Sequence, residues 1–87
     1  MDVDHDACRK VHLDVKKIES IARRLSKAAH EAELLGITVF GGSGTGSLRI
    51  HDDPRNNALI LAQLNGVFDG GDGGYHEDDE GFLRGES

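Results

Sequence analysis

The stretch from Ile37 to Ile50, ITVFGGSGTGSLRI, constrains the fold more than any other part of this sequence. Two short apolar runs, 37–40 and 47–50, contain β-branched residues and flank six residues, of which four are glycine and two carry hydroxyl groups. Such runs on either side of a glycine cluster are typical of antiparallel strands joined by a hairpin. We therefore predict two strands with a flexible six-residue loop at 41–46.

The residues before this hairpin have the pattern of one amphipathic helix. Between Asp6 and Leu35 there is no glycine or proline, and apolar residues recur at spacings of three and four, which places them on one stripe. The stripe consists of Val11, Val15, Ile18, Ile21, Ala22, Leu25, Ala28, Ala29, Ala32 and Leu35. Aspartates at positions 2, 4 and 6 suit the helix N-terminus, where carboxylates cap free amide groups. We predict an uninterrupted helix from about Asp6 to Leu35, with Gly36 as its left-handed C-cap.

The residues after the hairpin predict the rest of the sheet and a tail. The nearly continuous apolar run Ala58–Leu64 is typical of a buried central strand. Asn65-Gly66 is a strong turn signal, so we expect Val67-Phe68 to begin a short fourth strand. From Asp69 onwards the chain is rich in glycine and acidic residues. Two apolar residues near its end, Phe82 and Leu83, leave open whether this tail is ordered.

These elements predict an α+β fold in a single domain over residues 1–87. It consists of one long N-terminal helix (1–35), an antiparallel sheet of three to four strands (36–68) and an acidic Gly-rich tail (69–87). A thirty-residue helix is about 45 Å long, which is more than the remaining residues can cover. The composition contains few aromatic residues to build a core. We therefore expect a homo-oligomer assembled through the N-terminal helix; the alternative is that the chain's own sheet covers the apolar stripe.

The charge and composition exclude several classes of protein. The net charge of −6 argues against direct nucleic-acid binding, which needs clustered lysine and arginine, and against binding to an anionic membrane. No apolar run is long enough to span a membrane, and the N-terminus does not have the pattern of a secretory signal. The single cysteine, Cys8, fits the reducing cytoplasm, and we expect it to be a small, partly buried apolar residue.

The glycine-rich loop is the candidate binding site. It lacks the lysine of a P-loop and the last glycine of the dinucleotide-binding pattern, so neither nucleotide motif is present. A loop without side-chain bulk can still direct several amide donors at one anion, and neighbouring side chains add hydroxyl groups, positive charge and aromatic rings. The predicted ligand-binding residues are Phe40, Gly42, Ser43, Gly44, Thr45, Ser47, Arg49, His51 and Tyr75. The alternative is a hairpin tip that binds nothing.

No pattern in the sequence indicates catalysis, a metal or a cofactor. The segment Asp69–Glu80 has the length of a calcium loop, but glycines occupy positions three and five, where ligands are needed. The five histidines are scattered, and no serine lies in a nucleophile elbow. We predict that the protein is not an enzyme, binds no metal and needs no cofactor.

Three pieces of the chain, LGITVFGGSGTGSLRI, ALILAQLNGVFDGGDGG and EGFLRGE, resemble parts of small, acidic, uncharacterised accessory proteins of bacteriophages and prophages. The resemblance covers most of the chain after the helix. It implies an anti-defence protein in the host bacterial cytoplasm. The first function it suggests is a sponge, a homo-oligomer that sequesters a phosphorylated nucleotide-type signalling ligand. The alternatives are an acidic protein-binding inhibitor of a host defence complex, as some anti-CRISPR proteins are, and a small structural or assembly protein.

Overall fold

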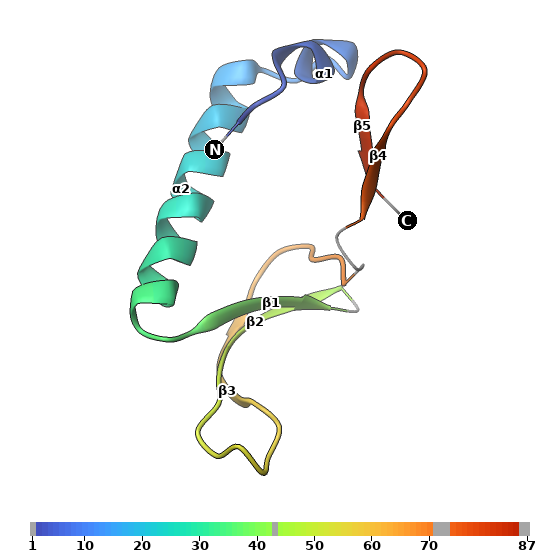
Figure 1. Cartoon of the computed structure of the whole chain (residues 1–87). Helices are drawn as coiled ribbons and strands as arrows, with labels where there is room; N and C mark the ends of the chain where they lie inside the picture. The colour runs from blue at the N-terminus through green and yellow to red at the C-terminus, as the bar shows by residue number, and fades with distance from the viewer. Residues whose placement is uncertain (1, 43, 71–73, 86–87) are drawn as a thin grey trace. The chain divides into compact units, whose positions relative to one another are not determined.

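The computed structural model describes residues 2–42, 44–70 and 74–85. In these ranges the chain forms two helices followed by five strands (Figure 1). The elements are α1 (His5–Lys10), α2 (Val15–Leu34), β1 (Thr38–Gly42), β2 (Thr45–Ile50), β3 (Leu59–Leu64), β4 (Tyr75–Glu77) and β5 (Leu83–Gly85). The predicted α+β class, a long helix followed by a small antiparallel sheet, is confirmed. The chain divides into two compact units, Met1–Glu31 and Ala32–Ser87, whereas the single domain remains a prediction.

The predicted uninterrupted helix is wrong at residues 11–14, which separate α1 from α2. At the end of α1 the His12 amide donates to the Arg9 carbonyl at 3.1 Å, and the Leu13 amide donates to the Cys8 carbonyl at 3.0 Å. This pair of hydrogen bonds is a Schellman motif. It places His12 in the left-handed region with φ 61°, where glycine or asparagine is the usual residue. The apolar stripe continues across this break, so the pattern does not reveal it.

Aspartates begin both helices, and glycine ends the second. Asp4 is the N-cap of α1, and its Oδ1 accepts a hydrogen bond from the Ala7 amide at 3.0 Å. Asp14 precedes α2, and its Oδ1 accepts from the Lys16 amide at 2.9 Å. After α2, Gly36 has φ 75° and its amide donates to the Glu33 carbonyl at 3.0 Å. The predicted C-cap at Gly36 is therefore confirmed.

The first unit buries little apolar surface. Cys8, a free thiol, is 8% exposed, which confirms the expectation of a small buried residue. A contact between His5 Nε2 and Glu19 Oε1, at 3.0 Å, joins α1 to α2. Along the apolar stripe of α2, Ile21 and Leu25 are 45% and 64% exposed.

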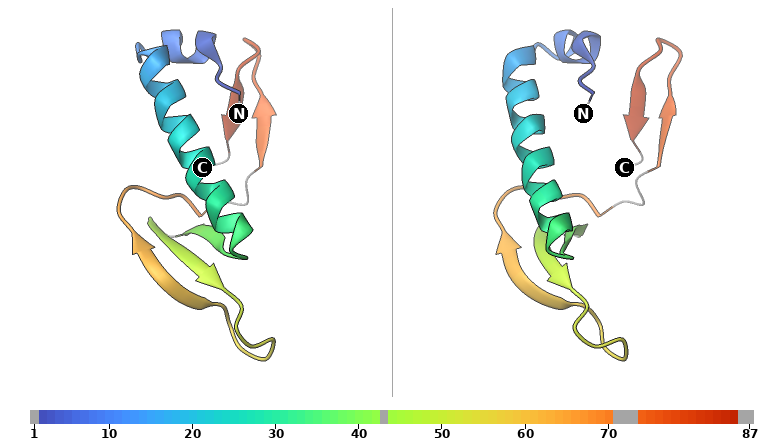
Figure 2. Two further views of the ribbon diagram at one scale, coloured as in Figure 1. Left: turned by 90° about the vertical axis from the view of Figure 1, so that its left-hand side faces the viewer. Right: turned by 60° about the vertical axis from the view of Figure 1, so that its left-hand side comes forward.

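In the second unit, β1, β2 and β3 form an antiparallel sheet in the order of the sequence. β2 and β3 make a curved ribbon whose connection, residues 51–58, projects past the sheet (Figure 2). Cross-strand pairs join Thr38 to Arg49 and Phe40 to Ser47. Because side chains alternate along a strand, these four residues share one side of the sheet, which we call the Arg49 face. The other side is the apolar face, which carries Val39, Leu48, Ile50, Leu59, Ala62 and Leu64.

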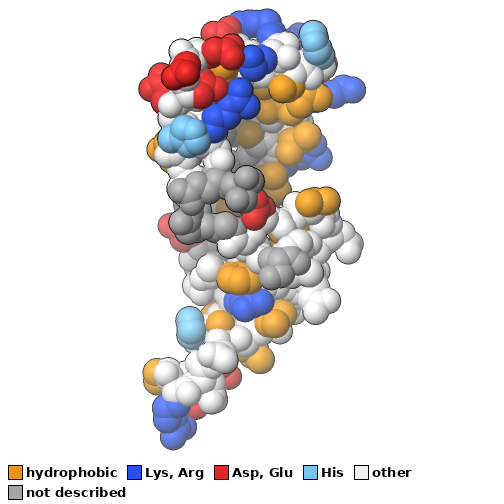
Figure 3. All heavy atoms as spheres, turned by 90° about the vertical axis from the view of Figure 1, so that its right-hand side faces the viewer, with side chains coloured by type: hydrophobic (Ala, Val, Ile, Leu, Met, Phe, Trp, Pro, Cys, Tyr) orange, Lys and Arg blue, Asp and Glu red, His pale blue; other side chains and the backbone are white. Residues whose placement is uncertain are grey.

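β3 lies at the edge of the sheet. The predicted strand is therefore confirmed, but the prediction that it is central and buried is wrong. Leu48 pairs with Ala62, whereas the next residue of β2, Arg49, pairs with Ile60. Leu61 is therefore the extra residue of a β-bulge. Leu59, Ile60 and Leu61 are each 49% exposed. Figure 3 shows hydrophobic side chains on the surface of the molecule.

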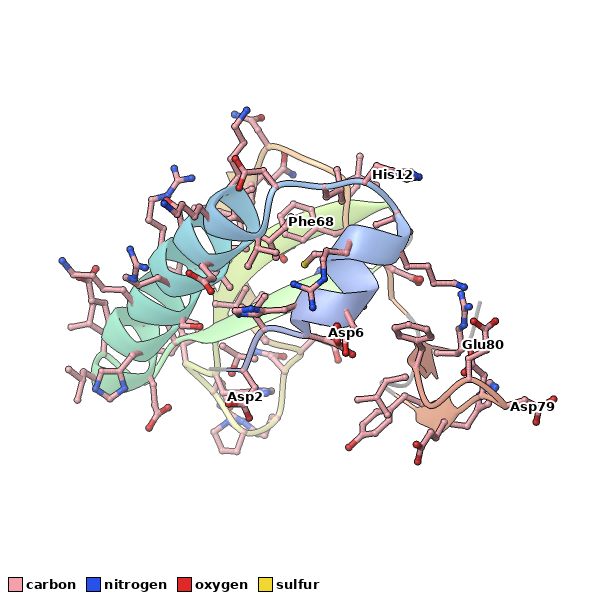
Figure 4. All side chains as sticks on the ribbon, turned by 90° about the horizontal axis from the view of Figure 1, so that it is seen from above. Asp2, Asp6, His12, Phe68, Asp79 and Glu80 are labelled. Atoms are coloured by element: carbon pink, nitrogen blue, oxygen red, sulfur yellow. The ribbon has the colours of Figure 1, made fainter. Side chains whose placement is uncertain are left out.

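The acidic tail contains a second, two-stranded sheet that the sequence did not predict, formed by β4 and β5. Asp78 organises the turn between these strands. Its Oδ1 accepts hydrogen bonds from the amides of Glu80 and Phe82, both at 2.9 Å, and its Oδ2 accepts from Arg84 Nε at 2.7 Å. The Arg84 guanidinium and the backbone donors lower the pKa of Asp78 to about 2. Asp79 and Glu80 lie at this turn (Figure 4).

Candidate functional site

The glycine-rich hairpin is tighter than the sequence predicts. Strands β1 and β2 extend to Gly42 and Thr45, which pair with each other, so a flexible loop of six residues is wrong. Gly44 lies in the turn and has φ 80°. Thr45 Oγ1 donates to the Gly42 carbonyl at 2.8 Å. Because the backbone on both sides of the turn follows the sheet ladder, it does not form the open anion-binding loop that was predicted.

Packing of Phe68 explains Gly46, whereas a Cβ at Gly41 would be in ordinary contact with Phe68. A Cβ at Gly46 would lie 2.7 Å from the Phe68 ring, and a Cβ at Gly41 would lie 3.4 Å from Phe68 Cβ. The ring therefore rests on bare backbone at the apolar face of the sheet (Figure 4). The predicted fourth strand at Val67-Phe68 is wrong, because residues 67–70 form no strand and Val67 is 98% exposed. Aromatic rings commonly cover glycines in strands in this way.

On the opposite side of the sheet, Phe40, Ser47 and Arg49 form what we call the Arg49 cluster. The Arg49 guanidinium lies over the Phe40 ring, with its Cζ 4.0 Å from the ring centroid. Arg49 Nε donates to Ser47 Oγ at 2.8 Å, and Ser47 is only 5% exposed. The Phe40 ring in turn covers Gly42, where a Cβ would lie 2.7 Å from Cε1. The cluster therefore fixes the orientation of a half-buried arginine.

Arg49 differs in its ion pairing from three other arginines of this acidic chain, whereas Arg23 and Arg24 of α2 likewise form no ion pair with a described carboxylate. Arg9, Arg55 and Arg84 each pair with an aspartate. Within residues 2–42, 44–70 and 74–85, no carboxylate forms an ion pair with Arg49. Its orienting partners are instead an aromatic ring and a hydroxyl group, both uncharged. A guanidinium held in this way presents its remaining donors to a carboxylate or phosphate.

The structure thus brings together three of the nine predicted ligand-binding residues, Phe40, Ser47 and Arg49, on a sheet face. Gly42, Gly44 and Thr45 lie at the hairpin end. Ser43 lies outside the described residues. The Arg49 side chain covers one face of the Phe40 ring.

The other two predicted residues are not part of the cluster. His51 follows the end of β2, and Tyr75 begins β4 and is 71% exposed. Sequence reasoning missed Gln63, which pairs with Ser47 across β2 and β3 and so lies on the Arg49 face. Its position depends on the strand register, which the apolar run of β3 does not reveal.

Other kinds of site receive no support from the residues that the structure describes. Among them no group of three or more histidine, cysteine, aspartate or glutamate side chains is arranged to hold a metal ion. The segment considered as a calcium loop contains strand β4, and Asp78 is engaged by backbone amides and Arg84. No described helix is long and apolar enough to cross a membrane. No protein-family model matches the chain, and no curated protein and no solved structure matches it either.

Proposed function

We propose that this protein is a non-enzymatic binding protein that sequesters a phosphorylated, nucleotide-type ligand at the Arg49 face. The observation that carries the proposal is the geometry of Arg49, which is oriented by Ser47 and Phe40 and is paired with no described carboxylate. A planar guanidinium with fixed orientation suits the two-pronged recognition of a phosphate group. The setting, a bacteriophage anti-defence protein in the host bacterial cytoplasm, rests on the sequence resemblance.

The overall charge of −6 opposes an anionic ligand at long range. In physiological salt this repulsion is screened beyond about 8 Å, so the groups nearest the ligand decide the affinity. At the Arg49 face the neighbouring groups include the Arg49 cation, the Gln63 amide, which lies opposite the buried Ser47, and the apolar Ile60, which pairs with Arg49. None of the three is acidic, and this local composition supports anion binding there.

Assembly into a homo-oligomer through α2 is part of the proposal. In the described ranges the only buried hydrophobic residues are Cys8 and Ala32. A chain of this length buries a smaller fraction of its surface on folding than a larger domain does. The exposed stripe residues Ile21 and Leu25 give a second copy an apolar surface to cover, and burial of such a side chain contributes about 1.5–3 kcal/mol.

A titration calorimetry series tests the ligand. The probes are a cyclic dinucleotide and ADP-ribose, with the wild-type chain and with Arg49→Ala. We expect binding of at least one probe and a loss of about 1.5–3 kcal/mol in Arg49→Ala, the value of a charged hydrogen bond. Arg55→Ala is the matched control, since Arg55 is exposed and pairs with Asp53. No heat with either probe, or an equal loss in both variants, would contradict the proposal.

A second candidate function, an inhibitor that binds a basic host protein, is favoured by the β4–β5 hairpin. Its turn carries Asp79 and Glu80 on a backbone fixed by Asp78 (Figure 4). Acidic groups held in this way steer a basic partner towards the hairpin. Capture of one host protein from lysate at low salt, and its loss at high salt, would favour this candidate over the nucleotide sponge.

A further inference from the structure

The outer edge of β3 lacks charged residues and proline, two of the protections that natural proteins give an edge strand, although the bulge at Leu61 is a third. β3 pairs with β2 on one side only, within the described sheet. From Asn56 to Phe68 there is no charged residue and no proline, although charged residues make up 30% of the chain. Natural edge strands are usually blocked by charges, prolines or short length, because their unpaired amide and carbonyl groups recruit further strands.

We propose that β3 pairs antiparallel with β3 of a second copy of this chain, across a two-fold axis, and so joins two three-stranded sheets into one. A strand that pairs with the same strand of a second copy makes an isologous contact. Every contact between two residues then occurs twice, once on each side of the two-fold axis. The edge that is used is the one opposite β2, and the side chains that gain contacts are Leu59, Ile60 and Leu61. This interface is separate from the one proposed for α2.

The bulge at Leu61 makes this pairing consistent with the two faces of the sheet. Leu59 pairs with Ile50 and Leu64 pairs with Gly46, so Leu59 and Leu64 both lie on the apolar face. In a regular strand, residues five positions apart lie on opposite faces. Antiparallel pairing of Leu59 with Leu64 of the second copy therefore continues the apolar face across the two-fold axis.

Electrostatics favour a second copy as the occupant at this edge. Two chains of net charge −6 repel each other wherever their carboxylates are brought together. The window from Asn56 to Phe68 contains no carboxylate, so two copies can meet along β3 without opposing like charges. The other edge strand, β1, carries Gly41 and Gly42 within its five residues, and glycine weakens strand pairing.

The test compares the mass of the assembly in solution between the wild-type chain and Leu61→Lys. Leu61 is half-exposed on the edge strand, so a lysine there is the charge that natural edges use against pairing. We expect sedimentation equilibrium to show a mass for Leu61→Lys that is half that of the wild type or less. The same circular dichroism spectrum for both chains shows that the fold is retained. A wild-type chain that is monomeric at all concentrations, or an unchanged mass in Leu61→Lys, overturns the proposal.

A matched variant, Leu25→Lys, separates this interface from the helix. Leu25 is exposed on α2, so Leu25→Lys tests assembly through the helix and leaves β3 intact. A loss of mass in Leu25→Lys alone overturns the β3 interface. If Leu61→Lys does not fold, hydrogen exchange of the wild-type chain at low and high protein concentration tests the β3 pairing instead. Amides of residues 59–64 that are more protected at high protein concentration support the pairing, and protection independent of concentration overturns it.

Discussion

Replacement of Gly46 by alanine tests the packing of Phe68 on the sheet. The added Cβ would lie 2.7 Å from two atoms of the Phe68 ring, which is too close for both groups to remain in place. Because Gly46 is held in the ladder between Gly41 and Leu64, we expect the ring to move away. Gly46→Ala therefore removes most of the contact between Phe68 and the apolar face.

The expected cost follows from the burial of the ring. Full burial of a phenylalanine side chain contributes about 1.5–3 kcal/mol, and Phe68 is half-buried. We therefore expect Gly46→Ala to lower the free energy of unfolding by about 1–2 kcal/mol. In a Phe68→Ala background the conflict is absent, and the same substitution restricts the unfolded chain, which stabilises by about 0.4–1 kcal/mol. The effect of Gly46→Ala should thus change sign.

Urea denaturation of the four chains of this double-mutant cycle, at one fixed protein concentration, measures the effect. Gly85→Ala is the control, because a Cβ at Gly85 has no neighbour within 4 Å; it should not destabilise. An equal loss of stability from Gly46→Ala with and without the Phe68 ring would refute the reasoning. It would mean that the glycine is needed for its backbone alone.

Three further predictions concern the helix ends and the acidic hairpin. Gly36→Ala should lower the free energy of unfolding by about 1–2 kcal/mol, the cost of a left-handed Cβ, because Gly36 has φ 75°; thermal denaturation measures this. His12→Gly should raise it by about 1 kcal/mol for the same reason, since His12 has φ 61°, and a loss of stability would contradict this account of the break. The pKa of Asp78 is lowered from 3.8 to about 2, mainly by Arg84. The stability that this carboxylate gives the hairpin is therefore complete above pH 3.8 and is lost as the pH falls towards 2. Amide NMR signals of Glu80 and Phe82 between pH 5 and 2 should follow this loss, and Asp78→Asn should abolish the pH dependence.

Local signals in the sequence predict the parts of the fold that depend on neighbouring residues. Gly36 after an apolar helical stripe predicts the end of α2, and Asp4 predicts a cap. The break at His12 was missed because the stripe is continuous and a residue other than glycine is uncommon at a left-handed position. The hairpin strands were predicted, although their extension to Gly42 and Thr45 was not, because glycines usually indicate a loop.

The sequence indicates which residues to consider for the candidate site, but it does not predict how their side chains are arranged. Arg49 and Phe40 were assigned to one site, and the structure places the guanidinium over the ring. That contact depends on the hairpin register, in which Gly42 pairs with Thr45 and which a six-residue loop would not set. The role of Gly46 depends on Phe68, which is 22 residues away along the chain. Such a contact between distant residues has no local pattern from which it can be predicted.

The buried thiol of Cys8 gives the molecule an internal reporter. It is the single cysteine of the chain and lies in the first unit, at 8% exposure. A thiol reagent reaches it only when that unit opens, so the labelling rate measures local opening of α1 and α2 without any engineered probe. Comparison of that rate with amide exchange in β1–β3 would reveal whether the two units open together or one at a time.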